Sequence, residues 1–89
     1  MYKIYVTKTF SRKLKTFLKK HPELETTISN KFDLLIKNPF DSQLRTHKLS
    51  GTLRNENAIS LTYEYRILFI IQNEDEIYLT NIGLHDEVY

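Results

Sequence analysis

The sequence predicts a single α+β domain in which an N-terminal helical hairpin covers one face of an antiparallel sheet. Apolar residues recur at helical spacing between Thr7 and Asn38, and after Asp41 they alternate with polar residues as they do in strands. The length of 89 residues supports one core, so we expect one domain over residues 1–89. The expected order of elements is β-α-α-β-β-β-β.

The first half of the chain should form a strand and two helices. Residues 2–6 alternate like a strand, and Thr7 or Thr9 can then cap a helix by accepting a bond from a free backbone N–H. Pro22 fits the first turn of a second helix, which should end before Asn38. The two apolar stripes consist of Phe10, Leu14, Phe17 and Leu18, and of Leu24, Ile28, Phe32, Leu35 and Ile36. Two helices joined so closely should pack as a hairpin.

The second half should form the rest of the sheet. The expected strands are residues 45–49, 58–63, 65–71 and 76–82, with turns at Ser50-Gly51 and over residues 72–75. Because these strands follow one another with short links, we expect antiparallel pairing. The side chains expected to face the helices are Tyr65, Ile67, Phe69 and Ile71. Arg66 has the opposite phase and should lie on the open face of the sheet.

Composition excludes several kinds of site. The chain has no Cys, only two Gly and three scattered His, so it has no disulfide, zinc spacing or Gly-rich phosphate loop. Its longest apolar run, over residues 67–71, is too short to span a bilayer, and the N-terminus lacks a signal peptide. We therefore expect a cytoplasmic protein. Residues 8–20 hold six basic and no acidic residues, which favours a polyanionic partner and makes Lys13 a candidate RNA contact.

Three segments, at residues 46–51, 60–69 and 81–89, together carry a family resemblance. They contain the runs HKLSG, YRILF and IGLHDEVY in the order and at the separations typical of the RelE/ParE toxin superfamily, and they resemble its YafQ-like branch of messenger-RNA-cleaving toxins. The resemblance implies a toxin of a type II toxin–antitoxin system, neutralised by a cognate antitoxin. It also implies metal-independent cleavage of messenger RNA in the ribosomal A site, without a cofactor. ParE-like members inhibit DNA gyrase on the same fold, so the fold alone does not decide the function.

RNA cleavage without a metal requires a base for the ribose 2′-OH, an acid for the departing 5′-oxygen and a cation for the phosphate. The resemblance implies that His47 or Glu64 is the base and His85 the acid, and that Arg66 grips the phosphate. The product should be a 2′,3′-cyclic phosphate. Tyr89 matches the terminal aromatic residue of the family, which stacks on a base or positions the phosphate. The cations expected to help hold the RNA are Arg45 and Lys48.

The chain departs from the YafQ-like pattern at three positions. Asn81 stands where that pattern has a catalytic Arg, Ser60 replaces a histidine, and Tyr65 replaces a Trp. Losing a cation at the phosphate costs roughly 10²-fold or more in rate. Two alternatives therefore stay open: a ParE-like gyrase inhibitor, and a weakened toxin that acts only by binding its antitoxin. His21 is expected to be structural or exposed, with no role.

Overall fold

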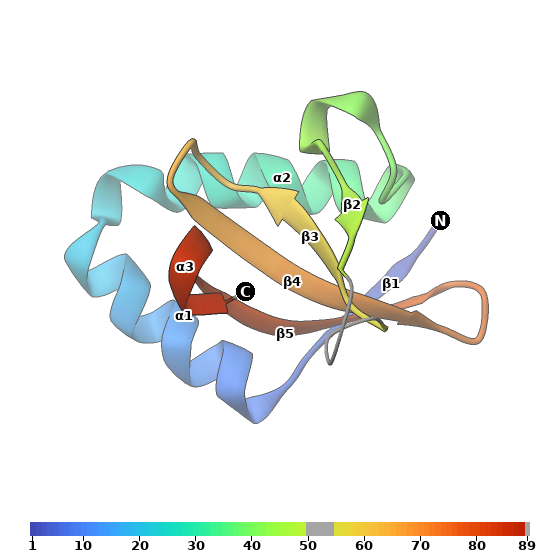
Figure 1. Ribbon diagram of the computed structural model, residues 1–89, viewed down its shortest axis with the longest axis horizontal. Coiled ribbons are helices and arrows are strands. Elements are labelled where there is room, and N and C mark those ends of the chain that lie inside the picture. Colours follow the sequence, from blue (N-terminus) through green and yellow to red (C-terminus); the bar gives the residue numbers. More distant parts are fainter. Residues whose placement is uncertain (50–54, 89) are drawn as a thin grey trace.

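The computed structural model describes residues 1–49 and 55–88 as an α+β fold built on a five-stranded sheet (Figure 1). Its elements are β1 (Lys3–Val6), α1 (Lys8–Lys20), the 3-10 helix η1 (Pro22–Leu24), α2 (Glu25–Lys37), the 3-10 helix η2 (Ser42–Leu44), β2 (His47–Lys48), β3 (Asn57–Ser60), β4 (Tyr65–Gln72), β5 (Glu76–Leu84) and α3 (His85–Val88). The predicted α+β class is confirmed, with α3 as an addition. The expected turn at Ser50-Gly51 lies outside the described residues.

Thr7 is the cap of α1. Its Oγ1 accepts a hydrogen bond from the backbone N–H of Phe10 at 3.1 Å and donates to the carbonyl oxygen of Leu79 at 3.0 Å. The same hydroxyl therefore starts the helix and ties it to β5. Lys19 and Lys20 occupy the last turn, where positive charge favours the helix dipole. Pro22 then starts η1, because a missing N–H costs nothing in a first turn.

The sheet is mixed, and the prediction of an antiparallel sheet is wrong at one edge. The strand order is β1-β5-β4-β3-β2, and β1 runs parallel to β5 with Ile4 opposite Ile77. The other three pairings are antiparallel, as expected. Short links force neighbouring strands to be antiparallel, but the helical layer and the other strands separate β1 from β5 in sequence. The rings of Tyr5 and Tyr78 stack across this edge, with centroids 5.1 Å apart.

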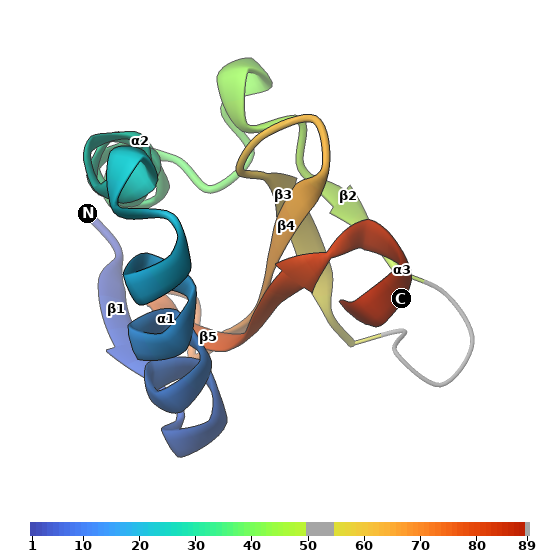
Figure 2. The same cartoon turned by 90° about the vertical axis from the view of Figure 1, so that its left-hand side faces the viewer.

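The helices α1 and α2 cover one face of the sheet, and α3 lies on the other (Figure 2). The helices α1 and α2 meet at η1 and diverge as an open V (Figure 1), so the expected close-packed hairpin is not confirmed. The rings of Phe10 and Phe32 lie 6.4 Å apart between them. Both helices contribute buried side chains to the main core, Phe10 and Phe17 from α1 and Ile28 and Leu35 from α2. Within the described part of the chain, no helix is long and apolar enough to cross a membrane.

The phase of β4 is as predicted. Ile67 and Phe69 are fully buried in the main core with Phe10 and Phe17 from α1. Leu68 points to the opposite face, where it packs with two other buried residues, Ala58 and Val88. Two strands are shorter than expected: β2 covers only residues 47–48, and β3 ends at Ser60 because the chain turns back over residues 61–64. This turn and α3 frame the functional site.

Candidate functional site

A hollow of about 540 Å³ opens where β4 begins and β5 ends, beside the first residues of α3. Val88 anchors α3 there, because its side chain packs on Ala58 and Leu68. The residues that line the hollow are Tyr63, Glu64, Arg66, Leu84, His85 and Asp86. Three of the predicted site residues, Glu64, Arg66 and His85, therefore come together.

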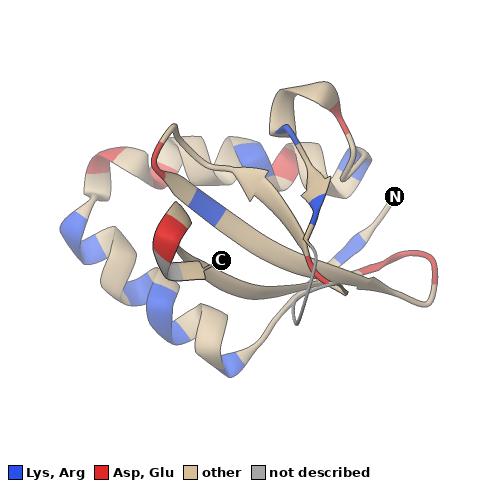
Figure 3. Cartoon of the chain, in the orientation of Figure 1, with Lys and Arg blue, Asp and Glu red and all other residues tan. Residues whose placement is uncertain are grey.

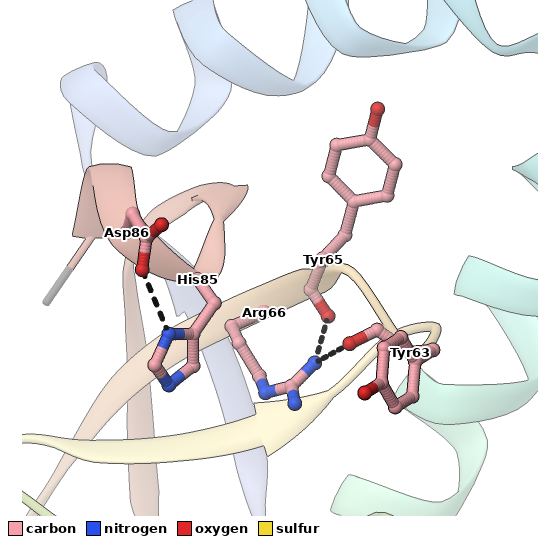
Figure 4. Close-up of polar contacts among 5 residues, drawn as sticks. All are labelled: Tyr63, Tyr65, Arg66, His85 and Asp86. Atoms are coloured by element: carbon pink, nitrogen blue, oxygen red, sulfur yellow. Dashed lines mark hydrogen bonds and ion pairs between the residues drawn. The ribbon is translucent and has the colours of Figure 1, made fainter.

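Arg66 is held by backbone carbonyl groups of the turn before β4. Its Nη1 donates to the carbonyl oxygens of Thr62 at 2.8 Å, Tyr63 at 2.9 Å and Tyr65 at 3.1 Å (Figure 4). These neutral acceptors fix the guanidinium without cancelling its charge, as a carboxylate partner would. Arg66 thus presents a fixed positive charge to the hollow.

His85 is the first residue of α3 and contacts two other residues that line the hollow, Glu64 and Asp86. Its backbone N–H donates to the carbonyl oxygen of Glu64 at 3.0 Å. Its Nδ1 lies 3.3 Å from Oδ1 of Asp86, and its side chain is half exposed, at 50%. In Figure 4 the side chains of His85 and Arg66 lie on the same side of the ribbon, whereas that of Tyr65 points away.

His47 lies on the same face of the sheet but lines another hollow. It pairs with Ala58, and directly opposed residues of antiparallel strands point to the same face, so its side chain lies on the α3 face. Its Nδ1 is 3.4 Å from the carbonyl oxygen of Arg45. Lys48 lines this second hollow of about 580 Å³ as well. Arg45 is exposed and has a left-handed backbone, with φ at 53°.

Lys13 reaches Asn81 at the edge of β5. Its Nζ donates to Oδ1 of Asn81 at 2.8 Å, so an ammonium group lies beside the position where the YafQ-like pattern has an Arg. Figure 3 shows basic residues along α1 and acidic residues on α3 and the β4–β5 turn. A groove of about 500 Å³ between α1 and β5 contains Lys13 and shares Leu84 with the first hollow.

Sequence reasoning missed one contact of the site, between Asp86 and His85. Asp86 was given no role, although its position next to His85 is a signal for a carboxylate–imidazole pair. His21, which was expected to be structural or exposed, makes a structural contact, because its Nε2 lies 3.1 Å from Oη of Tyr65. Tyr89 lies outside the described residues.

The fold and the match to a family model together show that the chain is a member of the RelE-like toxin superfamily. More narrowly, the chain belongs to the YafQ family, because residues 2–89 match the family model described as "Bacterial toxin of type II toxin-antitoxin system, YafQ". No curated protein sequence matches the chain.

Solved structures share the fold. YafQ from E. coli strain BL21(DE3) superposes with a TM-score of 0.83 at 15% identity, over 100% of this chain and 99% of that one. A copper-bound mutant toxin from Helicobacter pylori superposes with a TM-score of 0.80 at 21% identity, over 100% of both chains. A chain from the E. coli DinJ-YafQ toxin-antitoxin complex superposes with a TM-score of 0.80 at 16% identity, over 99% of this chain and 97% of that one.

Proposed function

We propose that this YafQ-family toxin is a ribosome-dependent endoribonuclease that cuts messenger RNA in the A site and acts in the cytoplasm. The observation that carries the proposal is the meeting of Glu64, Arg66 and His85 in one hollow. A carboxylate, a guanidinium and an imidazole are the groups that a base, a phosphate clamp and an acid require. Side chains supply all three roles, so the proposed reaction is independent of metal ions.

The base in this proposal is Glu64. Its carboxylate takes the proton of the ribose 2′-OH, and the 2′-oxygen then attacks the adjacent phosphorus. Glu64 is favoured over His47 because Glu64 lines the same hollow as the proposed acid, whereas His47 lines another. We assign His47 to binding the RNA along the same face, together with Arg45 and Lys48.

The acid is His85. The carboxylate of Asp86 beside Nδ1 orients the imidazole, so that Nε2 gives its proton to the departing 5′-oxygen. The bond from phosphorus to the 5′-oxygen breaks as the bond to the 2′-oxygen forms. The products are a 2′,3′-cyclic phosphate and a 5′-hydroxyl end.

The phosphate clamp is Arg66, whose guanidinium stabilises the negative charge that develops on the phosphoryl oxygens. Lys13 adds positive charge in the neighbouring groove. Tyr63 is 95% exposed on the rim of the hollow, where an aromatic ring can stack on an unpaired base. Tyr89 stays a proposed base-stacking residue from the family resemblance.

We also propose a cognate antitoxin as the protein partner. One E. coli structure that shares this fold is a complex of YafQ with DinJ, described as a toxin-antitoxin complex. An antitoxin that covers the hollow on the α3 face would keep RNA away from Glu64 and His85. Copurification with the product of a neighbouring small gene tests this partner.

The function is tested by adding the protein to a translating cell-free system and mapping messenger-RNA ends. We expect codon-phased cuts with 5′-hydroxyl ends from the natural protein and none from His85→Gln. Lys37→Gln, at the end of α2, is the matched control and should cut normally. Intact RNA together with blocked DNA supercoiling by gyrase would establish the ParE-like alternative instead. Intact RNA without that block would leave antitoxin binding as the only activity.

A further inference from the structure

Tyr65 connects the site to the helical layer. Its side chain points away from Arg66 and toward the helices (Figure 4), where Oη lies 3.1 Å from Nε2 of His21. The ring packs edge-on against Phe17, with centroids 4.9 Å apart and planes at 83°. The ring of His21 lies 4.8 Å from that of Phe17. The phenol therefore has both a polar and an apolar anchor.

His21 is itself fixed by the turn between α1 and η1. Its backbone N–H donates to the carbonyl oxygen of Phe17 at 2.8 Å, and its carbonyl oxygen accepts from Leu24 at 3.0 Å. Nδ1 lies 3.5 Å from a carboxylate oxygen of Glu23. A proton on Nδ1 faces that carboxylate, so we assign Nε2 as the acceptor of the Tyr65 hydroxyl proton.

The main chain of Tyr65 closes the turn that bears the site. Its carbonyl oxygen accepts from Leu61 at 2.9 Å and from Nη1 of Arg66 at 3.1 Å. Its N–H donates to Oγ1 of Thr62 at 3.3 Å. The carbonyl oxygen of the preceding residue, Glu64, accepts a hydrogen bond from the backbone N–H of His85. The positions of the three proposed catalytic groups therefore depend on where Tyr65 sits.

We infer that His21 and Tyr65 form a positioning pair, which fixes the catalytic hollow from the opposite face of the sheet. Neither residue lines the hollow; both line the neighbouring groove between α1 and β5. The hydrogen bond between them sets the position of Tyr65, and through its main chain the pair sets the spacing of Glu64, Arg66 and His85. The activity readout of this inference rests on the proposed nuclease function.

The test begins with Tyr65→Phe, which removes the hydroxyl and keeps the ring on Phe17. In the cell-free cleavage assay we expect kcat to fall roughly 10-fold while KM is unchanged, because small displacements of catalytic groups slow chemistry more than binding. His21→Gln, whose amide can bond the phenol, should lose less activity than His21→Leu. In NMR spectra of Tyr65→Phe, the signals of the His85 backbone N–H and Arg66 Nε–H should shift.

The matched control is Tyr78→Phe, which removes a hydroxyl in β5 from a ring stacked on Tyr5. It should leave kcat and both NMR signals unchanged. Each protein is measured well below its own melting temperature, so loss of fold is excluded. The inference is overturned if Tyr65→Phe keeps the kcat of the natural protein, or if Tyr65→Phe and Tyr78→Phe lose kcat equally. If the natural protein cuts no RNA, the proposed function fails, and the NMR signals alone decide: shifted signals support the positioning pair and unmoved signals overturn it.

Discussion

The backbone N–H of His85 donates to the carbonyl oxygen of Glu64 across 3.0 Å, which ties the start of α3 to the turn before β4. One hydrogen bond thus joins the residues that we assign as acid and base, although they lie far apart in the chain. The register of β4 and β5 sets it up, because Tyr65 pairs with Leu84. The hollow is therefore a consequence of the pairing of β4 with β5.

The first prediction separates the two candidate bases. Glu64→Gln keeps the size of the side chain and removes its basicity, so cleavage should fall roughly 10²-fold or more. His47→Gln should cost about 10-fold or less, since His47 lines another hollow and would lose only RNA contacts. Single-turnover cleavage of messenger RNA in the A site measures both rates. The reverse order of losses would make His47 the base.

The second prediction concerns Asp86. Asp86→Asn removes the charge beside Nδ1 of His85 and should lower kcat roughly 10-fold with KM unchanged, because the role proposed for the carboxylate is to orient the acid rather than to bind RNA. Asp75→Asn, in the turn between β4 and β5, is the matched control and should cut at the natural rate. A rise in KM alone would show that Asp86 acts on RNA binding.

The third prediction places a base on Tyr63. Stacking of a base on an aromatic ring contributes about 1–3 kcal/mol, so Tyr63→Ala should raise KM roughly 10-fold. Tyr63→Phe keeps the aromatic face and should behave like the natural protein. An unchanged KM in Tyr63→Ala would remove this ring from the RNA path.

The fourth prediction tests how α3 is held. Val88→Ala should cost about 1–2 kcal/mol, mainly as local opening of α3, because its side chain packs on Ala58 and Leu68 rather than in the main core. Hydrogen exchange at residues 85–88 should quicken, and cleavage should fall with it. Phe69→Ala, in the main core, should instead cost about 3–5 kcal/mol and lower the melting temperature of the whole protein. Equal exchange in Val88→Ala and the natural protein would contradict this anchoring.

Local patterns in the sequence predict much of this fold. Alternation along β4 is a property of adjacent residues, so the inward phase of Ile67 and Phe69 and the outward phase of Arg66 could be read directly. The parallel pairing of β1 with β5 could not, because it depends on the path of the whole helical layer. The open V of α1 and α2 depends likewise on how each helix packs on the sheet.

The residues of the candidate site come from the family resemblance, whereas their geometry comes from the fold. Glu64, Arg66 and His85 stand out through the family resemblance, but their meeting depends on the register of β4 and β5. The separate hollow of His47 depends on where β2 pairs with β3, and two residues of pairing leave little pattern to read. The contact of His21 with Tyr65 joins two distant segments and has no local signal.

The central claim is that His85 protonates the departing 5′-oxygen within the hollow. The most direct measurement uses a messenger RNA in the A site whose scissile 5′-oxygen is replaced by sulfur, because a thiolate leaves without needing a proton. We predict that His85→Gln cuts this substrate at nearly the natural rate, while Glu64→Gln remains slow. An equally large loss for His85→Gln on the oxygen and sulfur substrates would contradict the assignment of His85 as the acid.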